Sequence, residues 1–170
     1  NEALGKIDIE TSDNDSRTVF YTSLYHAFIQ PSLASDVDGR YRTMGHEIKQ
    51  DASYTNYTVF SLWDTFRAAH PLYTIVTPEQ NQAFIRSLLR KYDEGGILPK
   101  WELASNETGT MIGYHAVSVI ADAMMKKQCD FDVKKALEAC IRSSVYDTTG
   151  VTPMMDRQIL NGKLMPVSIK

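Results

Sequence analysis

The stretch from Thr77 to Gly96 constrains the fold most, because it carries both a helix start signal and a helix stop signal. Thr77 suits the cap position, Pro78 suits the first helical position, and Gln80 follows at the spacing of a capping box. Apolar side chains then recur at helical spacing up to the glycine pair: Phe84, Ile85, Leu88, Leu89 and Tyr92. The sequence therefore predicts one long amphipathic helix here.

Four further stretches have a helical apolar period. They run from Asp13 or Asp15 to about Phe28, from about Tyr57 to Ala69, from about Gly109 to Lys127, and from Asp130 or Asp132 to about Tyr146. Pro31 and Pro71 are expected to end the first two. A short helix over 154–160 has a weaker pattern, because prolines and a glycine interrupt that region.

Two long connections separate these helices, over 29–56 and 95–108. The first contains the turn Asp38-Gly39, which predicts a small β-hairpin near residues 34–48. An ordinary bundle keeps its connections short, whereas long loops that alternate with short turns fit a helical toroid. We therefore expect an all-α fold, a partial (α/α)6 toroid of antiparallel helix hairpins, with both long loops at one end.

Composition limits the classes of function. The chain has 170 residues, 43% of them hydrophobic, with 18 basic against 21 acidic side chains, which is typical of an ordinary globular domain. No basic patch favours nucleic acid, and no apolar run approaches the roughly 20 residues of a membrane span. Residues 1–170 are expected to form a single domain, and the start at Asn1 indicates an excised fragment of a larger one.

Cysteine and histidine do not predict a metal site. Cys129 and Cys140 are too far apart for a mutual disulfide if one helix spans both, because eleven residues rise about 16 Å. The four histidines match no zinc pattern. Asp36 and Asp38 flank a turn, which explains them without a metal.

An aromatic side chain and a carboxylate stand together at Trp63-Asp64. An indole ring offers an apolar face to the C–H side of a pyranose, and a carboxylate accepts hydrogen bonds from vicinal hydroxyls. Trp63 also fits a buried stripe with Phe60 and Phe66, and Asp64 could pair with Arg67. The pattern favours a carbohydrate cleft over those readings only together with a second segment.

That second segment runs from Leu98 to His115 and repeats the theme of Trp101 followed by carboxylates and small residues. Glu107, Thr108 and His115 are its polar candidates for sugar contact. His115 could equally be a core histidine that is hydrogen bonded through one ring nitrogen.

Five runs of residues, taken in order, resemble glycoside hydrolase family 92. They are Val19–His26, Asp36–Tyr41, Tyr57–Thr65, Gly96–Trp101 and Glu107–His115. The similarity covers nearly the whole chain with natural spacing. These enzymes are exo-acting α-mannosidases, with a β-sandwich followed by an (α/α)6 barrel, and the chain is similar to the first part of that barrel.

The resemblance implies calcium-dependent hydrolysis of α-mannosides, often α-1,2 linked, with inversion at the anomeric carbon. Inversion uses an acid and a base whose carboxyl groups are about 6.5 to 9.5 Å apart. The family's motifs for both carboxylates are missing from this sequence. We therefore expect no catalytic residue in the chain and assign none of its residues to a metal. Calcium belongs to the full-length parent, with ligands mostly outside this chain.

The resemblance places Trp63 and Asp64 in the pocket for the terminal mannose. Glu107, Thr108 and His115 match a family motif near the cleft. The implied partners are mannose-containing glycans and the rest of the parent chain, and the implied location is a secreted or periplasmic bacterial enzyme. An incomplete toroid would leave apolar helix faces uncovered, which predicts self-association or marginal stability of the fragment.

Two other classes of function compete with this interpretation. One is a different helical-toroid glycosidase or lyase, which analogues of glucose or uronic acid would distinguish from a mannosidase. The other is a noncatalytic helical interaction module, for which the side chains of the cleft would not converge.

Overall fold

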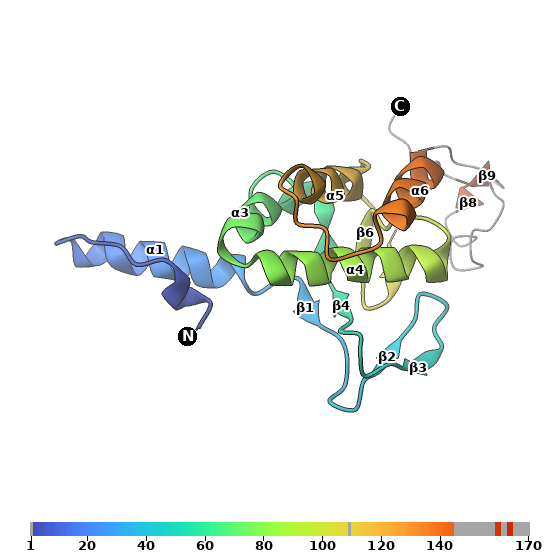
Figure 1. Cartoon of the computed structure of the whole chain (residues 1–170), viewed down its shortest axis with the longest axis horizontal. Coiled ribbons are helices and arrows are strands. Elements are labelled where there is room, and N and C mark those ends of the chain that lie inside the picture. Colours follow the sequence, from blue (N-terminus) through green and yellow to red (C-terminus); the bar gives the residue numbers. More distant parts are fainter. Residues whose placement is uncertain (1, 109, 145–158, 161–162, 165–170) are drawn as a thin grey trace.

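The computed structural model describes residues 2–108 and 110–144, and the strand residues 159–160 and 163–164 (Figure 1). A short 3-10 helix, η1 (Leu4–Lys6), precedes the α-helices. These are α1 (Asn14–Ala27), α2 (Leu62–Thr65), α3 (Ala69–Val76), α4 (Pro78–Gly95), α5 (His115–Met125) and α6 (Val133–Ser144).

Short strands occupy the connections between the helices. They are β1 (Ser32–Leu33), β2 (Arg40–Arg42), β3 (Ile48–Gln50), β4 (Tyr57–Thr58), β5 (Phe60–Ser61), β6 (Trp101–Leu103), β7 (Asn106–Glu107), β8 (Ile159–Leu160) and β9 (Lys163–Leu164). All pairings are antiparallel: β1 with β4, β2 with β3, β5 with β6, β6 with β7, and β8 with β9. The all-α expectation therefore holds only in part, because helices and small sheets are combined.

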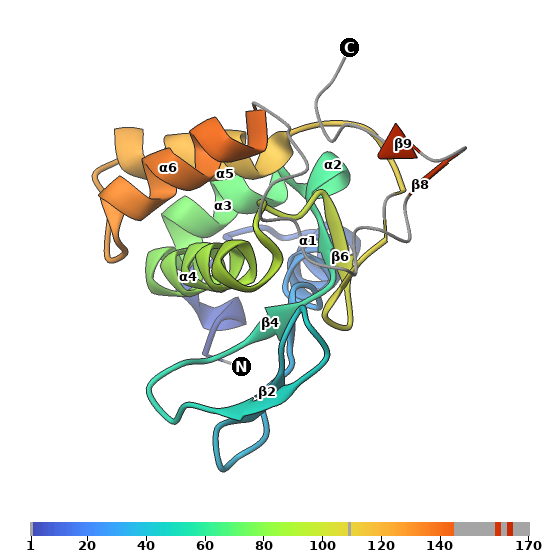
Figure 2. The same ribbon diagram turned by 90° about the vertical axis from the view of Figure 1, so that its right-hand side faces the viewer.

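The core lies where α3, α4, α5 and α6 pack on one another (Figure 2). Side chains with almost no exposure fill it, among them Leu62, Tyr73, Ile85, Leu88, Ile120, Ala123, Ala136 and Ala139. Small residues on α5 and α6 let these two helices approach each other closely. Phe60 of β5 and Leu62 of α2 pack into the same core. The strand β5 is therefore anchored on the helices.

The long helix predicted between Thr77 and the glycine pair is confirmed as α4. Pro78 is its first residue, where the missing N–H of proline would lack a helical partner anyway. Gly96 ends the helix with φ 85°, a conformation that favours glycine. The proline and glycine signals thus located both ends correctly, whereas the predicted capping box is not formed, because the Thr77 side chain makes no capping hydrogen bond.

Two other predicted helices are also present. Asp13 caps α1 by accepting hydrogen bonds from the backbone N–H groups of Asp15 and Ser16. This helix extends away from the rest of the chain in Figure 1, and Leu24 is its one buried residue. Asp132 accepts from Lys135 N at 3.0 Å at the start of α6, which is described to Ser144.

The helix expected from Tyr57 to Ala69 is wrong. This stretch contains β4, β5 and the single turn α2, and the next helix, α3, contains Pro71. Tyr57, Thr58 and Phe60 are residue types that favour strands, and Val59 with φ 66° redirects the chain between two sheets. Pro71 is only the third residue of α3, so its missing N–H breaks no helical bond.

The helix predicted from about Gly109 starts later, at His115. Met111 and Gly113 have φ values of 63° and 111°, so the chain before His115 is an irregular loop. The weak helix over 154–160 lies mostly outside the described residues, and its last two residues form β8.

A hairpin is present near residues 34–48, but its two strands are β2 and β3, so the segment before the Asp38-Gly39 turn is not one of them. β2 pairs with β3, and Ser35 makes a single bridge to Tyr41 across the Asp38-Gly39 turn. The Cβ atom of a larger residue at position 39 would come within 2.9 Å of the Ala52 backbone, and φ there is 81°. Glycine is therefore required at this turn.

The two long connections meet, as predicted. Ser105 Oγ donates to Arg42 O at 2.7 Å, and the His46 ring lies 2.8 Å from Asn106 Oδ1.

None of the described helices combines the length and the apolar character that a membrane span requires.

Candidate carbohydrate-binding site

Trp63 and Asp64 lie on α2, directly after β5. Leu62 is fully buried beneath them, so it anchors this single turn in the core. Trp63 is 41% exposed, and Asp64 is exposed as well. The expectation of a buried aromatic stripe therefore does not apply to Trp63, and both side chains are accessible to a ligand.

The neighbours of Asp64 come from the same turn. Ser61 Oγ donates a hydrogen bond to Asp64 Oδ2, which orients the carboxylate. The guanidinium of Arg67 lies 5.0 Å from the centroid of the Phe66 ring. Arg67, the alternative partner of Asp64, thus stacks on an aromatic face instead.

His115 joins this turn from the start of α5. Its ring meets the Phe66 ring edge to face, with centroids 4.0 Å apart. Burial lowers the pKa of His115, and the nearby charge of Arg67 lowers it further. The imidazole is therefore favoured in its neutral form, which can both donate and accept a hydrogen bond.

Gly113 makes room for the His115 ring. A Cβ atom at this position would lie 2.0 Å from His115 Cε1. The φ of 111° also requires glycine. The loop before α5 is thus shaped around the histidine.

Glu107 and Thr108 belong to the hairpin of β6 and β7. The buried carboxylate of Glu107 accepts from Lys100 N at 2.6 Å and from Trp101 N at 3.2 Å. Thr108 Oγ1 donates to Trp101 O at 2.9 Å. Both side chains therefore fix the backbone around Trp101.

Strand pairing brings the two candidate segments together. Ser61 is the register partner of Trp101, so the hairpin lies next to the turn that carries Trp63 and Asp64. α2 also contacts α5, where His115 begins. The five candidate residues thus come from three adjacent segments, with Trp63 and Asp64 exposed, His115 half-buried and Glu107 within the hairpin.

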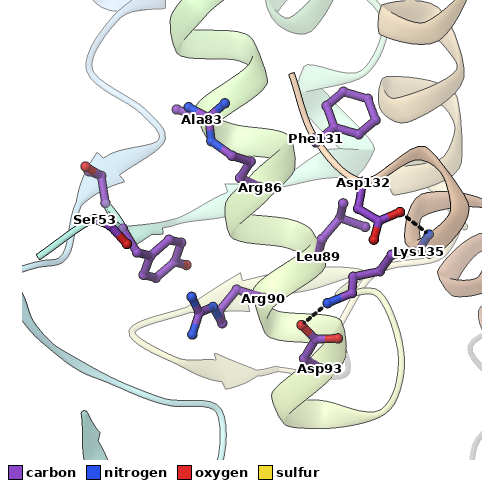
Figure 3. A pocket seen from close by; sticks show the side chains of 11 residues that line it. Ser53, Ala83, Arg86, Leu89, Arg90, Asp93, Phe131, Asp132 and Lys135 are labelled. Atoms are coloured by element: carbon purple, nitrogen blue, oxygen red, sulfur yellow. Dashed lines mark hydrogen bonds and ion pairs between the residues drawn. The ribbon is translucent and has the colours of Figure 1, made fainter. Parts of the chain in front are cut away.

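A hollow of about 510 Å³ lies elsewhere, on the outer face of α4 (Figure 3). Its wall includes Tyr54, Arg86, Arg90, Phe131 and Lys135, and none of the five candidate residues. Volume alone supplies no sugar chemistry, so Trp63 and Asp64 stay the candidate residues for sugar contact.

The cations of this hollow already have partners. Arg86 pairs with Asp130 at 2.7 Å, and Lys135 pairs with Asp93 at 2.7 Å. Arg90 pairs with Asp51 at 2.9 Å and lies 4.6 Å from the Tyr54 ring centroid. Binding an anion there would have to break these contacts.

The side chains that most often bind metals do not cluster in the part of the chain that the structure describes. Within 2–108 and 110–144, no three His, Cys, Asp or Glu side chains converge on one point. Calcium prefers six to eight oxygen ligands.

Sequence reasoning missed the supporting residues of the site. Phe66 and Gly113 shape the position of His115, while Lys91 and Glu102 lie buried beneath the strands. The glycine two residues before His115 was the available signal. Nothing in the spacing of Lys91 and Glu102 indicated that they meet.

An exposed indole ring beside an exposed carboxylate, at Trp63 and Asp64, suits a carbohydrate ligand. Comparison with known proteins gives the class of protein. A family model described as the glycosyl hydrolase family 92 catalytic domain matches residues 1–163. The chain therefore belongs to glycoside hydrolase family 92. No curated protein sequence matches it.

Solved structures support this assignment. The chain is similar to the family GH92 α-mannosidase BT3965 from Bacteroides thetaiotaomicron, with 42% identity, a TM-score of 0.82 and 87% of the chain covered. That enzyme is also known in complex with mannoimidazole. The inverting mannosidase BT2199 from B. thetaiotaomicron VPI-5482 matches with 31% identity, a TM-score of 0.78 and 88% coverage.

The chain spans only 20% of the length of each of these two relatives. The family assignment thus concerns a part of the catalytic domain.

Proposed function

We propose that this chain is the first part of the helical catalytic domain of an α-mannosidase, and that it supplies contacts to the terminal mannose. Family membership and the solved relatives support mannoside hydrolysis. The observation that carries the site is the exposed Trp63 beside the Asp64 carboxylate, on a turn held against the Trp101 hairpin.

In this proposal Trp63 packs its ring on the C–H face of the sugar, and Asp64 accepts hydrogen bonds from two hydroxyls. His115 adds a neutral group that can donate to or accept from a third hydroxyl. Glu107 and Thr108 act on the sugar through the backbone that they fix. The catalytic acid and base come from other parts of the enzyme.

The finer chemistry rests on the family resemblance. We propose hydrolysis of α-1,2-linked mannosides with inversion, an (α/α)6 toroid completed by the rest of the parent chain, and dependence on calcium whose ligands lie mostly outside this chain. Inversion is also the property named for the relative BT2199. A secreted or periplasmic bacterial enzyme is part of the same proposal.

Self-association of the 170-residue chain is a related proposal. Val133, Leu137 and Ile141 follow one another at four-residue spacing on α6 and are 40%, 59% and 56% exposed. Such an apolar stripe favours contact with another surface. The rest of the parent chain would cover the stripe in the intact enzyme.

The intact enzyme provides the test of function. Hydrolysis of α-1,2-mannobiose is compared with that of α-glucobioses, with and without a calcium chelator, and the anomer released first is read by proton NMR. We expect activity on the mannoside alone, loss of activity with the chelator, and β-mannose as the first product. Equal activity on both sugars would contradict the mannose assignment, and α-mannose would contradict inversion.

A further inference from the structure

Two charged side chains meet in the interior beneath the candidate site. Lys91 Nζ on α4 lies 3.2 Å from Glu102 Oε1 on β6, and the side chains are 2% and 0% exposed. Apolar residues often replace a buried ion pair without loss of stability. Stability alone is therefore a weak reason for this pair.

The carboxylate of Glu102 connects three separate segments. Its Oε1 accepts from Thr58 Oγ1 at 3.1 Å, from Ser105 N at 2.7 Å and from Lys91 Nζ. Thr58 Oγ1 in turn accepts from Ala104 N at 2.7 Å. One buried group thus ties β4, α4 and the β6–β7 turn together.

These contacts surround backbone in unfavourable conformations. Val59, Ala104 and Ser105 are not glycines, yet their φ values are 66°, 50° and 61°. Such conformations persist only where the surroundings enforce them, and they concentrate at functional sites. Hydrogen bonds from Thr58, Ala104 and Ser105 to this network supply that enforcement.

The two segments of the candidate sugar site, the turn of Trp63 and Asp64 and the hairpin of Trp101, both adjoin this hydrogen-bond network. Val59 leads through β5 into the turn of Trp63 and Asp64, while Glu102 directly follows Trp101. Phe60 is the register partner of Glu102, and Ser61 is that of Trp101. A shift of the Glu102 carboxylate would therefore move both segments at once.

We propose that Glu102 is a positioning residue for the sugar site, with Lys91 as the partner that makes its burial tolerable. This role rests on the proposed function for its effect on catalysis. Its effect on local structure does not depend on that function. Glu102 touches the backbone of the site and not the sugar.

The test compares two uncharged double variants. Lys91→Met with Glu102→Leu removes the acceptor of the Ser105 and Thr58 hydrogen bonds, whereas Lys91→Met with Glu102→Gln keeps an acceptor oxygen of similar size. Neither variant leaves a buried charge without its partner. Lys135→Met, which removes an exposed ion pair with Asp93, is the control.

Two measurements are made below the onset of unfolding. The first is kcat/KM of the intact enzyme for an α-mannoside. The second is the pair of indole N–H signals in the 170-residue chain, whose two tryptophans are Trp63 and Trp101. We expect the leucine variant to lose at least about tenfold in kcat/KM and to shift both indole signals. The glutamine variant and the control should stay within about threefold, with unchanged signals.

Equal behaviour of the two double variants, either both active or both impaired, would overturn the proposal. If the leucine variant does not fold, Thr58→Val, which removes one bridging hydroxyl, replaces it. A shift of both indole signals in Thr58→Val, with unchanged signals in the glutamine variant and the control, is then the expected result. An intact enzyme without any mannosidase activity would refute the proposed function, and the indole signals would still decide the role of Glu102.

Discussion

The two faces of α4 place their polar side chains in opposite environments. Toward the core, Asn81, Ser87 and Lys91 are almost fully buried and bond to the His70 ring, the Tyr57 backbone and Glu102. Toward solvent, Arg86, Arg90 and Asp93 border the open hollow of Figure 3 and form partly exposed ion pairs.

This difference shows which polar groups determine the shape of the site. A buried group that loses its partner carries the full desolvation cost, whereas an exposed group returns to water. The inner face of α4 should therefore determine the position of β5, which leads into the turn of Trp63 and Asp64, and of β6, which carries Trp101. The outer face should tolerate substitution.

The largest effect is expected for Lys91→Met alone. It leaves the Glu102 carboxylate charged and buried without its cation, so the free energy of unfolding should fall by about 3 to 5 kcal/mol. Urea unfolding of the 170-residue chain measures this change. A loss below about 1 kcal/mol would contradict the cost expected for a buried Glu102 without its partner.

The inner face should also respond to pH through His70. Burial lowers the pKa of this ring to about 4. The unfolded chain keeps the ordinary value near 6.5, so it binds the additional proton first, and stability is lost as pH falls from about 6.5 to 4. The unfolding free energy should decrease by up to about 3 kcal/mol over this range.

The matched pair for this measurement is His70→Gln and His26→Gln, since His26 is exposed on α1. The first substitution should flatten the pH dependence, and the second should leave it unchanged. An unchanged slope in His70→Gln would assign the effect to other groups.

A smaller effect is expected for Ser87→Ala. Tyr57 N donates to Ser87 Oγ at 2.9 Å, and the Tyr54 hydroxyl lies at the same distance. Removing the hydroxyl leaves the Tyr57 N–H without this acceptor and should cost about 1 to 3 kcal/mol. Faster hydrogen exchange at the Tyr57 amide is the local measure, and unchanged exchange would contradict it.

The smallest effect is expected on the outer face. Lys135→Met removes an ion pair whose side chains are 37% and 41% exposed. Such pairs contribute about 0 to 1 kcal/mol, so thermal unfolding should change little. A loss as large as that of Lys91→Met would remove the distinction between the two faces.

The sequence predicted the helices better than the strands. Proline, glycine and aspartate signals are local, so they located α4 and the starts of α1 and α6. The stretch from Tyr57 to Ala69 was misjudged because its conformation depends on pairing with a hairpin about 40 residues away along the chain.

The candidate site shows the same division. Trp63 and Asp64 were predicted from their chemistry, and the structure exposes both, while their contact with a sugar stays a prediction. The roles of Lys91 and Glu102 depend on contacts between α4, β4 and β6, which no local pattern encodes. Long-range hydrogen bonds thus supply what periodicity could not.

The central claim is that Asp64 binds the terminal mannose. Its most direct test is steady-state hydrolysis of α-1,2-mannobiose by the intact enzyme and by its Asp64→Ala variant, with Asp93→Ala as a control carboxylate on the outer face of α4. Hydrogen bonds to a charged group contribute about 1.5 to 3 kcal/mol, so kcat/KM of Asp64→Ala should fall about 100-fold, while Asp93→Ala stays near wild type. Wild-type activity in Asp64→Ala would contradict the account and remove this residue from the site.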